Sequence, residues 1–546
     1  MNPLPAARAV VDLLRDEGVD RVFGNPGTTE LPLLQELARD GDPDYVLALQ
    51  EFTAVAAADG YARGTGRPAF VSVHAVPGVS NALIGMNNAR RSRTPLVITA
   101  GQQDQRFLRD SPMLGGDLVG LAAPACLAAD EVHTADDLLP MFRRAFARAR
   151  GVPSGPVFVS VPMNLLAQPA AGPIPARPPI VTLPVATGID EAAALLAGAS
   201  NPAIMAGDRV GATGALRELT AVAEALGATV YPQPQYEHVD ADTEHPLTAP
   251  APPFIGSEIN KALAGHDALL LAGASIRSHL WTPEPPLPEG IRVVQLDDDP
   301  AEIGRAHDVE IGLFGAVGPT LDALAEALRG LPGLHGPALE RAGRISAELV
   351  PERTRWRERA RAAAGPAPVH PATAAQLVAD ALAAGTVVVE EAVTSGPLLR
   401  RALPQRGPGD YHNSSGNGGL GWGIGAAVGL HLAHPGRPVL AFLGDGSAMF
   451  GVQGLWTAAR LGAPVLFVVV NNHEYRTLKD SLGRQFGGMD LGDPAIDWVG
   501  LARSMGLSAH RVGHASEIGP AVRAAQESGG PRLVEIPIRG YGDGAP

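Results

Sequence analysis

Short apolar runs alternate with helical patterns along the whole chain, and many of the runs end on Gly, Asp or Asn. This alternation is typical of parallel α/β sheets, whose strands are covered on both faces by the crossover helices. The strand candidates fall into three groups, so we expect three doubly wound parallel sheets. The candidate strands include 45–49, 69–73, 96–100 and 157–161, then 203–206, 268–272 and 292–296, and finally 386–389, 439–443, 465–470 and 533–536.

Two stretches rich in Pro, Ala and Gly interrupt the alternation. They span 168–184 and 364–371 and have neither helical nor strand periodicity, as expected of linkers. A chain of 546 residues is long enough for three or four domains. The charged segment 338–361 before the second linker predicts a surface helix. We therefore expect three α/β domains, at residues 1–175, 185–345 and 370–546.

Composition and charge narrow the kind of partner. The net charge is -14 and no long run of Lys or Arg occurs, which disfavours a nucleic-acid-binding protein. No apolar run reaches the roughly 18 residues of a membrane span, and segment 3–18 lacks the pattern of a signal peptide. A single cysteine, Cys126, cannot form an internal disulfide. We expect a cytoplasmic protein with a small-molecule ligand and neither a nucleic-acid nor a membrane partner.

The most informative segment is a pair of polar motifs that follow two successive strands. Asp445 lies between two glycines after the run 439–443, and Asn472 follows the run 465–470. Ligands in open α/β sheets bind beyond the carboxyl ends of the strands, so both side chains should face one crevice. The glycines let backbone N–H groups approach a phosphate. Mg²⁺ prefers oxygen ligands, which Asp445, Asn472 and a carbonyl near Glu474 would supply. The alternative is an ordinary pair of strand-end turns.

The sequence Gly444-Asp445-Gly446-Ser447, followed at this separation by Asn471-Asn472, resembles the signature of thiamine-diphosphate-dependent enzymes. The resemblance extends over essentially the whole chain and is closest to the benzoylformate decarboxylases. It implies that Mg²⁺, or Ca²⁺ in its place, is held by Asp445, Asn472 and the carbonyl of Glu474. It also implies that the cofactor contacts Gly446, Ser447 and Tyr475.

Two further segments are similar to cofactor-binding segments of that family. Thr394 and Ser395 follow a predicted strand and resemble a second phosphate contact. Gly418 and Leu420 resemble the stretch that holds the cofactor in a bent conformation, in which the leucine would separate the two rings and the Gly418 carbonyl would face the aminopyrimidine. A Gly-rich stretch at a helix start can also serve close packing alone.

Glu51 is the candidate for the carboxylate that faces the pyrimidine ring. It follows the run 45–49 and begins a helical pattern, so it should lie at the carboxyl end of a strand. The segment 47–63 is closely similar to the family segment with this carboxylate. The alternative is a glutamate that only interacts favourably with a helix N-terminus.

Two histidines are candidates for proton transfer. His74 ends a predicted strand, and His279 lies in a polar loop after another. Either could be an ordinary polar residue, but both match histidines of benzoylformate decarboxylases, in which the pair handles protons. Imidazole suits this role because it donates and accepts protons near neutral pH.

Thr28 stands in Phe23-Gly24-Asn25-Pro26-Gly27-Thr28, where the family has a serine whose hydroxyl binds the substrate carboxylate. Thr28 keeps the hydroxyl but adds a methyl group, and it could instead only cap a helix. The stretch 476–481 is more polar than the family's pocket wall, and Arg106 and Arg109 lie in the loop after Gly101-Gln102-Gln103. These departures suggest a 2-oxo acid with a polar or acidic group.

The resemblance implies a non-oxidative 2-oxo-acid decarboxylase that releases an aldehyde and CO₂, with the cofactor as electron sink. The enzymatic alternative is a carboligase of the acetolactate synthase or benzaldehyde lyase type. A different class is a thiamine-diphosphate-binding protein without turnover, which would not need Glu51. The family also implies a homotetramer, a dimer of dimers with active sites shared between two chains. No dinucleotide fingerprint for FAD is found between 185 and 345.

Overall fold

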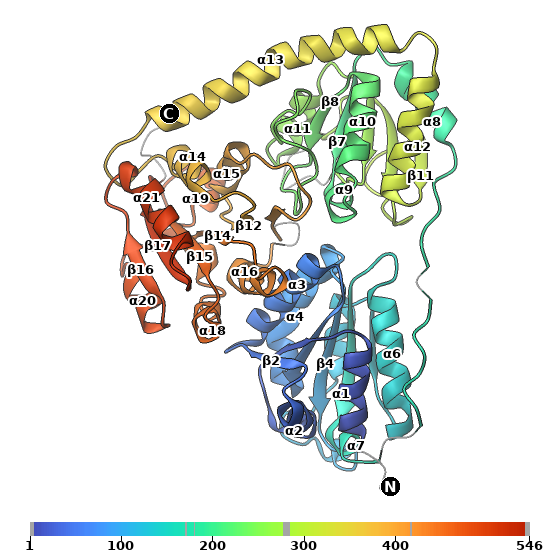
Figure 1. Cartoon of the computed structure of the whole chain (residues 1–546), viewed down its shortest axis with the longest axis vertical. Helices are drawn as coiled ribbons and strands as arrows, with labels where there is room; N and C mark the ends of the chain where they lie inside the picture. The colour runs from blue at the N-terminus through green and yellow to red at the C-terminus, as the bar shows by residue number, and fades with distance from the viewer. Residues whose placement is uncertain (1–4, 170–171, 180, 277–283, 415–417, 541–546) are drawn as a thin grey trace.

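The computed structural model describes residues 5–169, 172–179, 181–276, 284–414 and 418–540. Three α/β lobes are arranged around a common centre, as Figure 1 shows. Each lobe contains one sheet, and every strand pairing within the three sheets is parallel. The α/β fold class expected from the alternating pattern is confirmed.

The N-terminal lobe has six strands in the order β2-β1-β3-β4-β6-β5. Its strands are β1 (Arg21–Gly24), β2 (Asp44–Leu47), β3 (Ala69–His74), β4 (Leu96–Gln102), β5 (Ala128–Glu131) and β6 (Pro156–Pro162). Its helices are α1 (Ala6–Asp16), α2 (Leu31–Asp40), α3 (Glu51–Thr65), α4 (Ala75–Arg91), α5 (Leu118–Ala122), α6 (Leu138–Ala149) and α7 (Met163–Leu166), and a short 3₁₀ helix, η1, spans Thr28–Glu30.

The middle lobe has five strands in the order β11-β10-β9-β7-β8. Its strands are β7 (Pro202–Ala206), β8 (Thr229–Pro232), β9 (Ala268–Ala272), β10 (Arg292–Asp297) and β11 (Ile311–Phe314). Its helices are α8 (Ile189–Ala197), α9 (Asp208–Ala212), α10 (Leu216–Leu226), α11 (Gly256–Leu263) and α12 (Val317–Gly330). The predicted surface helix is α13 (His335–Ala362), which runs along the top of Figure 1 to the third lobe.

The C-terminal lobe repeats the strand order of the first, as β13-β12-β14-β15-β17-β16. Its strands are β12 (Val387–Glu391), β13 (Tyr411–His412), β14 (Val439–Gly444), β15 (Val465–Asn471), β16 (Ser508–Arg511) and β17 (Arg532–Pro537). Its helices are α14 (Pro371–Ala381), α15 (Gly396–Ala402), α16 (Trp422–Ala433), α17 (Asp445–Ala448), α18 (Gly454–Leu461), α19 (Arg476–Leu482), α20 (Trp498–Ser504) and α21 (Ala515–Gln526).

Helices α3 and α16 join the N-terminal and C-terminal lobes at very close range. A Cβ added to Gly429 would lie 1.9 Å from the Ala57 carbonyl oxygen, and one on Gly60 would lie 2.2 Å from that of Ala426. Such distances require glycine, because any side chain would force the helices apart. The first turn of α3 and the first turn of α16 are therefore fixed relative to each other.

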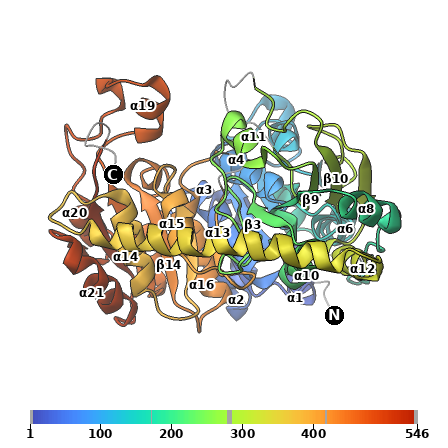
Figure 2. The ribbon, with the colours of Figure 1, turned by 90° about the horizontal axis from the view of Figure 1, so that it is seen from above.

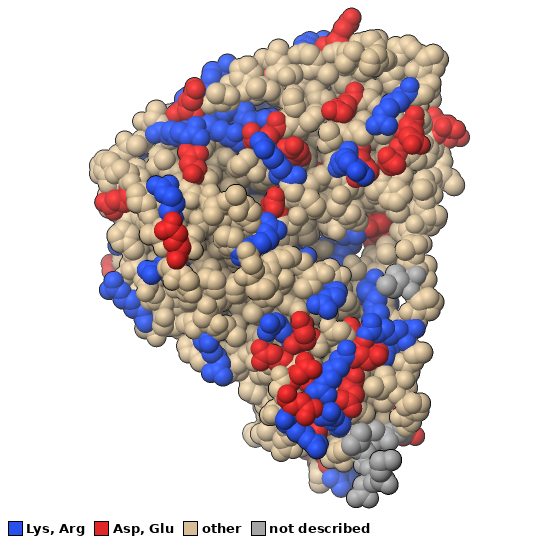
Figure 3. Space-filling view, in the orientation of Figure 1, with Lys and Arg blue, Asp and Glu red and all other residues tan. Residues whose placement is uncertain are grey.

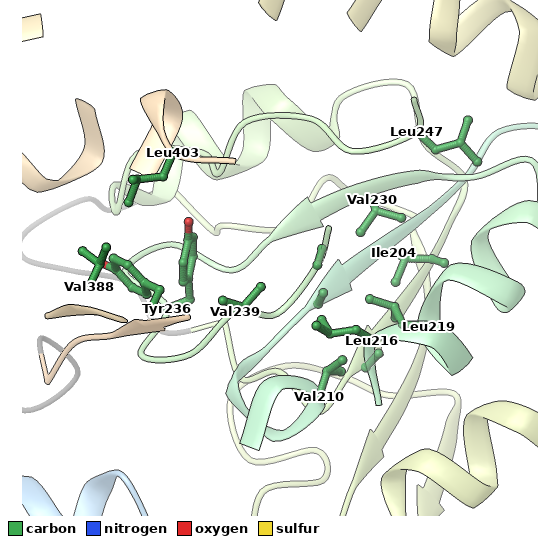
Figure 4. Packing of buried hydrophobic residues seen from close by; sticks show 14 of the residues in the cluster. Ile204, Val210, Leu216, Leu219, Val230, Tyr236, Val239, Leu247, Val388 and Leu403 are labelled. Atoms are coloured by element: carbon green, nitrogen blue, oxygen red, sulfur yellow. The ribbon is translucent and has the colours of Figure 1, made fainter. Parts of the chain in front are cut away.

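The middle lobe is attached through apolar packing and through buried charges. Figure 4 shows one apolar cluster that continues from Val239 and Tyr236 of the middle lobe to Val388 and Leu403 of the C-terminal lobe. Arg63 of α3 is buried where the three lobes meet. Its guanidinium donates to the Asn413 carbonyl at 2.7 Å and lies 3.4 Å from Glu237, and it also stands over the Trp422 ring at 4.7 Å.

Acidic and basic side chains share the surface. On the face shown in Figure 3 they lie interspersed, and a row of basic side chains with acidic ones beside it follows α13 along the top. Among the described residues, no helix is both long and apolar enough to cross a membrane.

Candidate active site

Asp445 lies at the carboxyl edge of the third sheet, next to the point where the strand order reverses between β12 and β14. It follows β14 and begins α17, and its side chain is buried. Its Oδ2 atom has no hydrogen-bond partner among the described residues. Burial raises the pKa of this carboxyl to about 7, although the N–H groups of Gly446 and His473 act in the opposite direction. A buried carboxylate oxygen without a partner is suited to bind a cation.

The segment after β15 turns sharply and packs against the Asp445 turn. Asn472 Oδ1 accepts the N–H of Glu474 at 3.1 Å, and His473 between them has a positive φ of 57°. The Tyr475 ring then covers Gly446, because a Cβ on this glycine would lie 2.7 Å from Tyr475 Cε1. The structure thus brings both halves of the predicted metal and diphosphate motif to one place.

Glu391, at the end of β12, connects the remaining predicted cofactor segments. Its carboxylate accepts the N–H groups of Gly421, Trp422 and Gly423 at 2.9 to 3.0 Å, and so caps the start of α16. Its carbonyl accepts the hydroxyl of Ser447 at 2.5 Å. Burial raises the pKa of Glu391 to about 8, although the three N–H donors lower it.

A small pocket lies beside Glu391. Leu420 and Gly418 line it, and so does Val393 of the turn that precedes Thr394 and Ser395. Thr394 is half-buried, whereas Ser395 is buried and precedes α15. Of the residues predicted to hold the cofactor, Gly418 and Leu420 therefore line a hollow at the end of β12, and Thr394 follows its wall directly in the chain. The complete lining is Glu391, Ala392, Val393, Ser414, Gly418, Gly419 and Leu420.

His74 is held in a defined orientation at the end of β3. Its Nδ1 atom lies 3.0 Å from Glu30 Oε2 and 2.9 Å from Thr29 Oγ1. The Thr29 hydroxyl donates to Glu30 Oε1 at 2.7 Å, and this oxygen also accepts the Gly101 N–H at 2.7 Å. A carboxylate can only accept hydrogen bonds, so Nδ1 must carry the proton. The other ring nitrogen, Nε2, is therefore the one that can accept a proton from a ligand or return it.

Glycine makes this arrangement possible. A Cβ on Gly27 would lie 2.0 Å from the His74 ring, so the η1 loop passes directly over the imidazole. Thr28 is the next residue in that loop and is exposed, whereas Thr29 and Glu30 are buried. The residues on either side of Thr28, Gly27 and Thr29, therefore both lie against the His74 imidazole.

Glu51 begins α3 as predicted and lies at the same edge of the first sheet. Its Oε2 atom accepts a hydrogen bond from Asn81 Nδ2 at 2.9 Å. Asn81 is on α4, the helix that starts immediately after His74. One turn further along α4, Ile84 is close to Gly419, and Asn88 donates to the Gly419 carbonyl at 2.9 Å. Helix α4 thus connects the Glu51 region with the pocket of the C-terminal lobe.

Three family models match the chain. They describe the N-terminal TPP-binding domain of thiamine pyrophosphate enzymes at residues 5–117, the central domain at 189–324 and the C-terminal TPP-binding domain at 393–536. The benzoylformate decarboxylase of Pseudomonas aeruginosa is 33% identical over 542 residues, which cover 97% of this chain and 98% of the relative. The chain belongs to the thiamine pyrophosphate enzymes. Thiamine pyrophosphate and thiamine diphosphate are two names for one cofactor.

The chain is similar to family members with different activities. The large subunit of acetolactate synthase isozyme 2 from Escherichia coli is 27% identical over 97% of this chain and 95% of its own length. Among solved structures, the thiamine diphosphate-dependent 4-hydroxybenzoylformate decarboxylase of Rhodococcus jostii RHA1 superimposes with a TM-score of 0.86 and 29% identity, covering 98% of this chain and 99% of its own.

The residues present fit thiamine diphosphate with a divalent cation. Oδ2 of Asp445 offers an unsatisfied oxygen, and the neighbouring Asn472 amide and Glu474 carbonyl are oxygen donors of the kind Mg²⁺ takes. Among the described residues no group of three or more His, Cys, Asp or Glu could hold a metal. This agrees with a ligand set that contains only one carboxylate, the rest being amide, carbonyl and cofactor oxygens.

The polar stretch that suggested a polar substrate has partners within the chain. Arg476 pairs with Asp480 at 3.0 Å, and Lys479 is buried between Glu474 and Asp490. In the loop after β4, Arg106 pairs similarly with Asp104. The charges of α19 therefore need no group on the substrate, whereas the Arg106 side chain is 75% exposed. The preference for a polar 2-oxo acid stays a prediction. His279 lies outside the described residues.

Four residues of the site were not found from the sequence: Thr29, Glu30, Asn81 and Glu391. Glu30 lies inside the segment that resembled the family, and its distance of 44 residues from His74 gave no local signal. Glu391 was visible only as the end of an apolar run. An acidic residue at the carboxyl end of a buried strand is a signal that could have identified it.

Proposed function

We propose that the protein is a decarboxylase that uses thiamine diphosphate and Mg²⁺, or Ca²⁺ in its place, to convert a benzoylformate-like 2-oxo acid to an aldehyde and CO₂ without oxidation. The observation that carries the proposal is His74, held by Glu30 at the end of β3, under the loop residue Gly27 that precedes Thr28. This reaction consumes one proton, because a 2-oxo acid anion gives a neutral aldehyde and CO₂. An imidazole whose Nδ1 atom is held by Glu30 is suited to supply it through Nε2.

The residues of the C-terminal lobe would hold the cofactor. Asp445, Asn472 and the Glu474 carbonyl would bind the cation, and Gly446 with Ser447 would contact the diphosphate. The Thr394 to Ser395 turn, Gly418, Leu420 and Tyr475 would complete the cofactor site. When bound, thiamine diphosphate supplies an electron sink for the electrons released with CO₂.

The residues of the N-terminal lobe would handle substrate and protons. The Thr28 hydroxyl would bind the substrate carboxylate, and His74 would deliver a proton through Nε2. Glu51, oriented by Asn81, would serve the pyrimidine ring of the cofactor. His279 would be the second proton carrier, as its match to the family suggests.

An aromatic substituent is supported by two observations. The benzoylformate decarboxylase and 4-hydroxybenzoylformate decarboxylase relatives align over nearly the whole chain. The charged side chains of α19 are paired within the protein, whereas Leu478 and Leu482 on the same helix are 48% and 43% exposed. An apolar helix face is a better wall for a ring than for a carboxylate.

The second candidate is a carboligase, which is favoured by the similarity to acetolactate synthases. A panel of 2-oxo acids in an aldehyde-coupled assay, with CO₂ release and product analysis in parallel, separates the two. We expect CO₂ and free aldehyde in equal amounts with benzoylformate. Predominant formation of a new carbon–carbon bond would show that the protein is a carboligase. Faster turnover of acidic 2-oxo acids than of benzoylformate would support the prediction of a polar substrate.

We also propose a cytoplasmic homotetramer whose active sites are shared between chains. Several large apolar side chains next to the site are 43% to 51% exposed in the single chain, which is consistent with their burial by a second copy. Light scattering after size-exclusion chromatography tests this assembly, and an active monomer would contradict it. These side chains are Leu49, Ile84, Val393 and Phe450.

A further inference from the structure

The chain contains 43 Lys and Arg residues, and only two of them are lysines, Lys261 and Lys479. Lys261 lies on α11 with 79% of its side chain exposed. Lys479 lies on α19, and only 2% of its side chain is exposed. Burial of an ammonium group costs several kcal/mol unless acidic partners compensate for it. All other basic residues of the Lys and Arg set are arginines. Of the two lysines, Lys479 is therefore the buried one, and it lies close to the predicted cation site.

Lys479 bridges two carboxylates that lie on either side of it in the sequence. Its Nζ atom donates to Glu474 Oε2 at 2.5 Å and also donates to Asp490 Oδ1. The Glu474 side chain is 7% exposed and that of Asp490 is 50% exposed. An ammonium group has three donors in a tetrahedral arrangement and can therefore join two separate carboxylates.

These residues close a lobe of the chain that spans 473–491. At its neck, Leu491 donates to the His473 carbonyl at 2.7 Å and Tyr475 donates to the Met489 carbonyl at 2.8 Å. Figure 2 shows α19 set apart from the other helices of the C-terminal lobe. The neck thus joins the two ends of this lobe, and the neck residues Tyr475 and Leu491 lie against Gly446 of the diphosphate turn.

The neck is also the predicted cation-binding turn. Glu474, whose carbonyl is the third proposed ligand, is the residue that Lys479 holds through its side chain. The preceding Asn472 amide accepts the Glu474 N–H, and the following Tyr475 ring covers Gly446 of the diphosphate turn. A shift of Glu474 would therefore displace two proposed ligands and one proposed diphosphate contact together.

We propose that Lys479 is a positioning residue for the cation: it ties Glu474 to Asp490 and thereby fixes the turn that presents the Asn472 amide and the Glu474 carbonyl. The inference rests on the proposed cation site. Lys479 itself touches neither substrate nor cofactor in this scheme. Its loss weakens the binding of Mg²⁺ and thiamine diphosphate, rather than the proton transfer at His74.

The two lysines allow a direct chemical test on the wild-type protein. An amine-selective acylating reagent is added, and the modification of each lysine is followed by mass spectrometry of the peptides. Lys261 should react fast under all conditions and serves as the internal control. Lys479 should react slowly with Mg²⁺ and thiamine diphosphate present, and clearly faster after the cation is removed with a chelator. Equal reaction of Lys479 with and without the cation would overturn the inference.

The second test measures cofactor affinity in variants. Lys479→Met, which keeps the length of the side chain, should weaken Mg²⁺-dependent thiamine diphosphate binding about tenfold or more in titration calorimetry. Lys261→Met is the matched control and should bind like the wild type. Asp490→Asn removes only the charge of the exposed partner, and its affinity for thiamine diphosphate should lie between those of Lys479→Met and Lys261→Met. This variant keeps the test valid if Lys479→Met does not fold.

The outcomes distinguish the two proposals. Unchanged affinity in both folded variants of the 473–491 lobe, with normal Mg²⁺ dependence in the wild type, would refute the role of Lys479 and leave the proposed function intact. A wild type that binds thiamine diphosphate without needing a divalent cation would overturn the proposed cation site, and the role of Lys479 with it.

Discussion

Replacing His412 with leucine removes an ionisable ring from the junction of the three lobes. His412 ends β13, is fully buried, and stands edge-on to His238 of the middle lobe at 5.6 Å. Burial lowers the pKa of His412 from 6.5 to about 3, and the positive charges of Arg63 and Arg437 act in the same direction. Leucine has a similar volume and no charge, so the packing should be kept.

The lowered pKa of His412 determines the sign and size of the effect. Between pH 6.5 and pH 3 the unfolded chain takes up a proton at His412 that the folded chain does not. Stability is therefore lost as the pH falls through this window, and for this one group the loss between pH 7 and pH 5 is about 2 kcal/mol. Two buried acids at the same junction change the stability with the opposite sign, because burial raises the pKa of Glu237 to about 7 and also raises that of Asp240. Only the difference between wild type and variant isolates His412.

The assay is urea unfolding at pH 7 and pH 5, followed by tryptophan fluorescence, because the buried Trp422 ring lies under Arg63 at this junction. The wild type should lose about 2 kcal/mol more than His412→Leu between the two pH values. His510→Leu, at a position with 59% of the side chain exposed, is the control and should behave like the wild type. The same pH dependence in His412→Leu as in the wild type would refute this explanation.

Three further predictions concern the active site. Glu30→Gln should lower kcat about 10² to 10⁴-fold with little change in KM, because an amide no longer fixes the His74 tautomer; a purely KM effect in steady-state kinetics would contradict this. Asp445→Asn should abolish Mg²⁺-dependent cofactor binding, while the melting temperature of the cofactor-free protein stays equal or rises, since a buried charge is removed whose Oδ2 atom has no partner among the described residues. Scanning calorimetry measures both, and retained binding would argue against the cation site. Glu51→Gln should keep thiamine diphosphate binding but abolish turnover, and an active variant would overturn the role assigned to Glu51.

The sequence predicted those parts of the site that depend on neighbouring strands. Asp445 and Asn472 follow two strands of one βαβ unit, and β14 pairs directly with β15, so their proximity follows from local topology. Glu51 and His74 also stand at the carboxyl ends of strands of one sheet, β2 and β3, although β1 lies between these two strands. The long buried strands were found because their apolar runs are continuous. The strands absent from the candidates have four residues or fewer, a length at which only β2 was found, and are β1, β5, β8, β11, β13 and β16.

The contacts that orient these side chains depend on tertiary distances. No spacing relates Glu30 to His74 or Asn81 to Glu51, because each pair joins different elements of the lobe. The sequence predicts the environment of Lys479 even less well. A lysine in a polar helical stretch is expected to be exposed to solvent, yet the chain folds back at Asp490 and buries Lys479. The polar substrate was predicted from such charged residues, whose partners within the protein are not visible in the sequence.

The contact between α3 and α16 limits how the molecule can move. Glycines bring the two backbones so close that no side chain separates them, so sliding or tilting would produce immediate steric overlap. The N-terminal and C-terminal lobes of one chain should therefore behave as a single rigid block. Any breathing motion that admits substrate must then come from the middle lobe, from the 473–491 lobe, or from the gap between one copy of the chain and the next.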